Sequence, residues 1–121
     1  MTKDSASAAL WMLDSSTFIN ALIIDRVTLL LSLRSPAFFP EYVFRFELGA
    51  NARDETREGA TQAVDRRQVG VQKLTLADLD RIAALGAPRR VGLGELACAV
   101  IAQRTGGGVL CDDWRARRWI E

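Results

Sequence analysis

The chain has 121 residues, of which 49% are hydrophobic, so we expect one globular core and a single domain over residues 1–121. Its 16 basic and 15 acidic residues give a formal net charge of +1, which neither requires nor excludes a polyanionic partner. There is no histidine, which excludes Ser-His-Asp and Cys-His catalysis, His-ligated zinc and any nuclease with a histidine base.

The N-terminal third is apolar, but charged residues interrupt it. Asp14 and the pair Asp25-Arg26 leave no run of about 18 to 20 apolar residues, so no membrane span is predicted. Asp4 and Asp14 also argue against a secretory signal peptide. We therefore expect a soluble, cytoplasmic protein in which Cys98 and Cys111 stay reduced and serve as small buried residues.

The first half of the chain predicts short alternating elements. Segment 8–13 is apolar and predicts a buried strand, with Asp14 at its carboxyl end. Dense apolar residues then predict two short buried helices over 17–24 and 27–33. Residues 37–39 suit a strand, and Pro40-Glu41 opens a helix that carries Glu47 and the core candidate Phe46.

The second half continues the alternation. Segment 51–67 is polar and predicts a solvated helix or a loop, and residues 69–74 alternate as a strand does. A capping box at 75–78 starts a helix that ends near Gly86, and a further helix runs from 94–95 to the glycines at 106–108. A strand over 109–111, the pair Asp112-Asp113 and a final helix over 114–120 complete the pattern.

This order of elements predicts an α/β fold, a three-layer sandwich with a short, mostly parallel sheet flanked by helices. Such sheets bind ligands beyond the carboxyl ends of their strands, where Asp14 and Asp112-Asp113 would lie. Because histidine is absent, any phosphodiester hydrolysis would need Mg²⁺ or Mn²⁺ held by converging carboxylates.

Four segments, taken in order, resemble the motifs of PIN domains, the fold of toxin ribonucleases in bacterial toxin-antitoxin pairs. The first is Trp11-Met12-Leu13-Asp14-Ser15-Ser16, similar to the opening strand and acidic turn of that family. The second and third are the Glu47-Leu48 step and the Gly94-Glu95 helix. The fourth is Cys111-Asp112-Asp113-Trp114-Arg115-Ala116-Arg117, similar to the family's strand and Asp-Asp-x-x-Ala-Arg turn.

The resemblance implies a metal-dependent endoribonuclease in which a metal ion lowers the pKa of a water that attacks the phosphate. It implies Asp14, Glu47, Glu95 and Asp113 as catalytic residues, with Asp14, Glu95, Asp112 and Asp113 as metal ligands. It also implies RNA as substrate, a homodimer and a possible antitoxin partner. Trp114 and the arginines of the last predicted helix, Arg115, Arg117 and Arg118, are candidate RNA contacts.

Each candidate also has a structural interpretation. Asp14, or alternatively Ser15 or Ser16, can cap a helix. Glu95 can complement a helix dipole, and Asp112-Asp113 can form a turn and a cap. Glu47 and the arginines can belong to solvated helix faces. Two departures from the family pattern, Ala97 in place of a second acid and the early stop at Glu121, predict a C-terminally shortened domain and leave open a non-catalytic RNA- or protein-binding module.

Overall fold

The computed structural model describes residues 10–86 and 91–111 and has an α/β architecture. Its sheet has four strands, β2 (Trp11–Leu13), β3 (Ala37–Pro40), β4 (Gly70–Gln72) and β5 (Gly108–Leu110). They lie in the order β4-β3-β2-β5, and every pair of neighbours is parallel. The prediction of an α/β fold around a parallel sheet is therefore confirmed.

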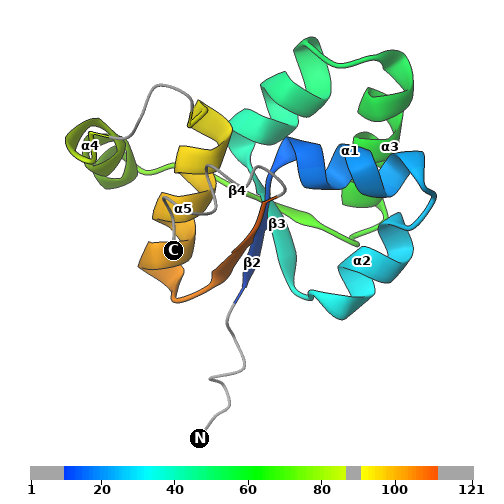
Figure 1. Ribbon diagram of the computed structural model, residues 1–121, viewed down its shortest axis with the longest axis horizontal. Coiled ribbons are helices and arrows are strands. Elements are labelled where there is room, and N and C mark those ends of the chain that lie inside the picture. Colours follow the sequence, from blue (N-terminus) through cyan, green and yellow to red (C-terminus); the bar gives the residue numbers. More distant parts are fainter. Residues whose placement is uncertain (1–9, 87–90, 112–121) are drawn as a thin grey trace, which may run out of the picture.

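Helices connect the strands and cover both faces of the sheet. Helices α1 (Ser15–Ile23), α2 (Val27–Leu33) and α3 (Asp54–Asp65), with the π-helix η1 (Val43–Ala50), lie on one side of it, and α4 (Leu76–Ala84) and α5 (Leu93–Thr105) lie on the other (Figure 1). Within the described parts of the chain, no helix is long and apolar enough to span a membrane.

Successive strand residues point to opposite faces and so divide the core in two. Leu13 and Phe39 belong to the cluster beneath α1, α2, η1 and α3, whereas Met12 and Phe38 face α5. The first cluster also includes an edge-to-face contact between the rings of Phe18 and Phe39, with centroids 5.2 Å apart. The second cluster holds α5 against the middle of the sheet, because Cys98, Ile101 and Ala102 pack against Met12.

Several helix boundaries follow local signals in the sequence. The Thr75 hydroxyl accepts the Asp78 N–H while the Asp78 carboxylate accepts the Thr75 N–H, which is the predicted capping box. Helix α5 ends at Gly106, which has a left-handed φ of 72°. A Cβ on the next residue, Gly107, would lie 2.2 Å from the Leu10 carbonyl oxygen, so the chain needs glycine to pass β2 at this point.

Three expectations about exposure or helix type were wrong or incomplete. The helices α1 and α2 were predicted to be buried, yet Ile23, Leu29 and Leu33 on these helices are exposed, as is Ile24, the C-cap of α1. Phe46 was expected in the core and is 47% exposed. The helix that carries Glu47 was predicted, but its π-helical form was not. Segment 54–65 forms a helix, the first of the two predicted alternatives, because Ala60 and Ala63 are small enough to pack closely.

Candidate functional site

The strand order singles out the boundary between β2 and β5. The chain proceeds from β2 to β3 and β4 in one direction and then crosses back to place β5 on the other side of β2. In open parallel sheets, ligands bind beyond the carboxyl ends of the strands where the connections reverse direction in this way. Asp14 directly follows β2, and its N–H donates to the carbonyl oxygen of Leu110 in β5 across 3.3 Å. Asp14 therefore stands where the fold favours a ligand.

The Asp14 side chain is 1% exposed and serves as the cap of α1. Its Oδ1 accepts the Thr17 N–H at 3.0 Å, and the Ser16 hydroxyl donates to Oδ2 at 3.2 Å. Asp14 thus caps a helix, which is the structural role that its sequence position also allowed. A carboxylate has about four acceptor positions, so these bonds leave lone pairs available for another donor or a cation.

Glu47 projects from η1 and reaches two other elements. Its Oε1 accepts the Ser15 hydroxyl at 2.7 Å, which connects it to the first residue of α1. Its carboxylate also lies against Gly94, because an ideal Cβ on that glycine would be 2.7 Å from Oε1 and 2.8 Å from Oε2. π-Helical segments are rare and occur mostly at functional sites. The side chain is therefore directed toward Asp14 and α5 rather than left on a solvated face.

Glu95 is the third residue of α5 and closes a turn at its start. Its Oε1 accepts the Gly92 N–H at 2.7 Å, as in a capping box. Burial raises the pKa of Glu95 above its ordinary value, and the negative charges of Asp14 and Glu47 raise it further, against the lowering effect of the Gly92 hydrogen bond. Glu95 is thus both a helix cap and a member of an acidic neighbourhood.

The structure brings Asp14, Glu47 and Glu95 within electrostatic reach of one another although they lie far apart in the sequence. The buried Cys98 thiol lies close enough that these three carboxylates add to the effect of burial, which raises its pKa well above the ordinary value. Both cysteines are buried, as predicted. Among the described residues, no ion pair involves any of the three carboxylates.

The three carboxylates do not by themselves form a metal cage. Among the residues that the structure describes, no group of three or more Asp, Glu, Cys or His side chains is spaced to hold a metal ion. Six further predicted site residues lie outside the described part of the chain, namely Asp112, Asp113, Trp114, Arg115, Arg117 and Arg118. The sequence places the first of them directly after Cys111, which follows β5.

A groove with a volume of about 610 Å³ adjoins Glu47. Ile19, Leu22 and Ile23 of α1 supply its apolar wall. Polar residues from the end of η1 to the start of α3 line the rest, including Asn51, Arg53, Glu55 and Thr56. It offers an extended ligand both an apolar surface and hydrogen-bonding groups next to the acidic residues.

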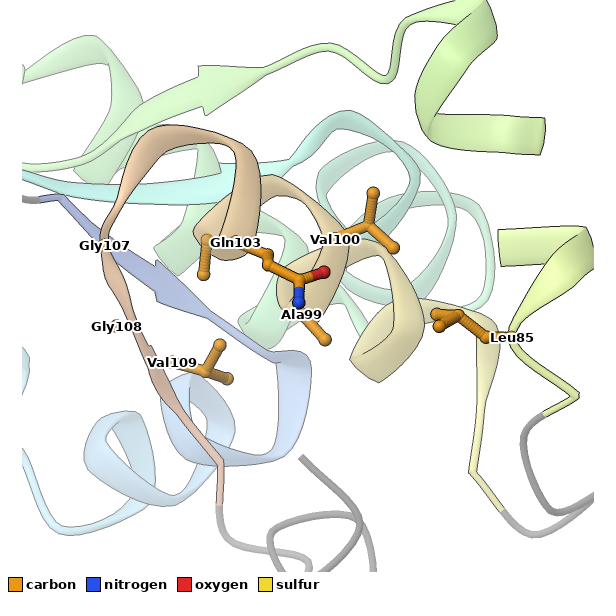
Figure 2. A pocket seen from close by; sticks show the side chains of 8 residues that line it. Leu85, Ala99, Val100, Gln103, Gly107, Gly108 and Val109 are labelled. Carbon is orange, nitrogen blue, oxygen red and sulfur yellow. The ribbon is translucent and has the colours of Figure 1, made fainter. Parts of the chain in front are cut away.

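A second groove, of about 440 Å³, lies between α5, β5 and the end of α4 (Figure 2). Leu85, Val100 and Val109 line it, and Gln103 supplies its one polar side chain among the described residues. Among the described residues that line this groove none is charged, so they supply no carboxylate for a cation and no counter-charge for a phosphate. The chemistry therefore favours the groove beside Glu47.

Sequence reasoning missed the side chains that hold the carboxylates in place. Ser15 was considered only as an alternative helix cap, yet it binds a glutamate 32 positions away. Gly94 was noted only as part of a motif, whereas the structure places the Glu47 carboxylate against it. Neither contact has a local signal, because both depend on how η1, α1 and α5 meet. Comparisons of the chain with protein-family models, with curated proteins and with solved structures gave no match.

Proposed function

We propose that this chain is a PIN-like, metal-dependent endoribonuclease whose site is built on Asp14, Glu47 and Glu95. One observation carries the proposal, namely that three carboxylates from β2–α1, η1 and α5 gather where the sheet connections reverse, without an ion-pair partner among the described residues. Like charges held together in a partly buried place are unfavourable unless a cation or a proton accompanies them. A divalent cation is the natural counter-charge.

The donor set fits Mg²⁺ or Mn²⁺ in chemistry. All of its groups are carboxylate oxygens, which hard cations prefer, and Mg²⁺ keeps several waters while it binds one or two carboxylates. Contact with all three side chains is therefore unnecessary. When bound, such an ion supplies the Lewis acid that activates water and offsets charge on the phosphate.

The residues of the chain have separate tasks in this proposal. Asp14 binds the ion with the lone pairs that Thr17 and Ser16 leave open. Glu47 is oriented toward the same space by Ser15, and Glu95 contributes negative charge from the start of α5. Asp112 and Asp113, which follow β5 in the sequence, complete the ligand set.

RNA is the proposed substrate. The groove beside Glu47 has an apolar wall for bases and a basic side chain, Arg53, for the backbone. Trp114, Arg115, Arg117 and Arg118 follow the acidic pair in the sequence and are proposed to hold the strand beyond the cleavage point. Whether the chain is the toxin of a toxin-antitoxin pair is tested by growth arrest on expression and by co-purification of a small basic protein.

The decisive experiment compares Asp14→Asn with the wild type on structured RNAs, with Mn²⁺ and with chelator. Asparagine is also a good helix cap, so this variant keeps the Thr17 hydrogen bond and removes only the charge. We expect cleavage to need Mn²⁺ and to fall at least about 100-fold in the variant. Asp25→Asn is the matched control, because Asp25 is exposed at a φ of 57°, a conformation that asparagine tolerates.

A non-catalytic binding module is the second candidate. It is favoured by Ala97, which is fully buried where an acidic residue would be an additional ligand, and by the engagement of Glu95 in its own helix cap. RNA binding that persists in Asp14→Asn, with no turnover in any metal, would establish this alternative. Metal-dependent turnover that Asp14→Asn abolishes would exclude it.

A further inference from the structure

Two glycines lie at the start of α5, the N-cap Gly92 and the second helical residue Gly94, and a carboxylate lies against each of them. An ideal Cβ on Gly92 would be 2.6 Å from Oε1 of Glu95, which bonds to the N–H of the same glycine. On Gly94, all three of the nearest atoms belong to the Glu47 carboxylate, at 2.7, 2.8 and 3.0 Å. Real Cβ atoms essentially never come this close to other heavy atoms. The glycines therefore provide the space that the two carboxylates occupy.

We propose that Gly94 is a positioning residue, whose missing side chain seats the Glu47 carboxylate against the start of α5, beside Asp14 and Glu95. This inference rests on the proposed function for its consequence, since a displaced Glu47 would leave the metal site. The geometric part concerns only where Glu47 lies and is independent of catalysis.

The backbone conformation at this position does not require glycine. Gly94 lies inside α5 and is not one of the glycines with positive φ, which are Gly86 and Gly106 in the described chain. No backbone atom is among its three nearest contacts, in contrast to Gly107. Glycine lowers helix stability relative to alanine, so an unconstrained position in α5 would favour alanine. The remaining reason for glycine at position 94 is the space that it leaves for the Glu47 carboxylate.

The start of α5 is also a favourable place for negative charge. The N–H groups of the first turn have no acceptors within the helix, and the helix dipole is positive at this end. Because Gly94 has no methyl group, the Glu47 carboxylate can lie nearer to this helix end than it could beside an alanine. The positive end of the helix dipole thus offsets part of the repulsion that arises when Glu47 lies near Glu95 and Asp14.

Gly94→Ala separates this role from a general role in folding. The new methyl group must displace the Glu47 carboxylate and break its hydrogen bond with Ser15, while α5 gains helix propensity. The matched control is Gly59→Ala in α3, where the new methyl group would meet only the tip of the Leu22 side chain, at 2.9 Å. Both changes add one methyl group to a helical glycine beside a flexible side chain.

The experiment has three readouts: crystal structures of both variants, Mn²⁺ binding by calorimetry, and melting temperature. For Gly94→Ala, we expect Glu47 to leave Ser15 and Mn²⁺ to bind at least about tenfold more weakly, with folding retained. For Gly59→Ala, we expect Mn²⁺ affinity within about twofold of the wild type, since second-shell effects do not extend to α3. In a Glu47→Ala background, Gly94→Ala should raise the melting temperature, because the clash is gone and the propensity gain remains.

A Gly94→Ala structure in which Glu47 still accepts the Ser15 hydroxyl would overturn the inference. The inference would also fail if Gly94→Ala still lowered the melting temperature in the Glu47→Ala background, because the new methyl group would then clash with a group other than Glu47. If the wild type neither binds Mn²⁺ nor cleaves RNA, the proposed function fails instead, while the structures and the melting temperatures still decide the positioning role of Gly94.

Discussion

The ion pair between Asp78 and Arg104 offers the sharpest test of what holds α4 against α5. The Asp78 carboxylate is 2% exposed and accepts from Nε of Arg104 at 3.0 Å and from Nη2 at 3.1 Å. It also accepts the Thr75 N–H at 2.9 Å, which closes the capping box of α4. Asp78→Ala removes all of these bonds, and Asp78→Asn keeps the shape and one carbonyl oxygen.

The expected cost follows from these contacts. Hydrogen bonds to a charged group contribute about 1.5 to 3 kcal/mol, and a capping bond contributes about 1 kcal/mol. The Arg104 side chain is 38% exposed, so water can solvate it after the change and no fully buried charge is left behind. We therefore expect Asp78→Ala to lower the free energy of unfolding by about 3 kcal/mol, and Asp78→Asn by about half of that.

The effect should depend on pH with a defined sign. Burial alone would raise the pKa of Asp78, but the hydrogen bonds from Arg104 and Thr75 outweigh it and bring the pKa below its ordinary value of 3.8. A carboxyl group with a lowered pKa stabilises the folded state above its unfolded pKa, and this contribution is lost as pH falls through the folded pKa. The difference between wild type and Asp78→Asn should thus be full at neutral pH and shrink below about pH 4.

Urea unfolding at neutral pH and at about pH 3 measures the stability that each variant loses and how this loss depends on pH. Asp80→Asn is the matched control, because Asp80 is an exposed acid on the same helix and should change the stability by less than about 0.5 kcal/mol. Equal effects of Asp78→Asn and Asp80→Asn, or a difference that is unchanged in acid, would refute this account of how α4 is held.

Further predictions concern the site and the core. Glu95→Gln keeps an acceptor for the helix cap and removes a carboxylate whose pKa is raised above its ordinary value of 4.5 by burial and by neighbouring acids. A group with a raised pKa costs stability once the pH is high enough to ionise it in the folded protein. The variant should therefore melt about 2 °C higher at neutral pH in calorimetry, while Mn²⁺ binding weakens. Mn²⁺ in large excess over its dissociation constant should raise the melting temperature of the wild type but not of Asp14→Asn, and equal shifts would place the ion elsewhere. Phe39→Ala should cost about 3 to 5 kcal/mol in urea unfolding, because this fully buried ring contacts Phe18 and Phe44. Cys98 should resist a thiol reagent in the native protein and react in denaturant, since burial raises its pKa and blocks access; rapid native labelling would contradict this.

Local patterns were sufficient to predict most of the elements. The break at residues 25–26, the capping box at Thr75 and the glycine that ends α5 each act over a few residues, so the sequence shows them directly. The placement of Asp14 at a strand end also followed from a short apolar run before a capping residue. These features could be predicted because their energetics are local.

The remaining features depend on contacts between distant segments. The π-helical form of η1 brings Glu47 to Ser15 and Gly94, and no spacing in the sequence indicates it. Likewise, Asp78 was predicted only as part of a cap, and its ion pair with Arg104 appears only when α4 packs on α5. The same limit explains why Ile23 was expected to be buried, since apolar density does not show which helix face meets the core.

The pairing of β2 with β5 has a consequence for folding in the cell. It pairs Trp11 with Gly108, two residues that lie far apart in the sequence. The strand β2, which precedes Asp14, therefore has only β3 as a neighbour until β5 has been synthesised. Contacts between such distant segments form late, because closing a long loop is entropically costly, and synthesis delivers the N-terminal strand first. We therefore expect the nascent chain to assemble its α1 to α3 side early and the acidic edge last. An enzyme organised in this way would acquire activity only after the segment that forms β5 has left the ribosome.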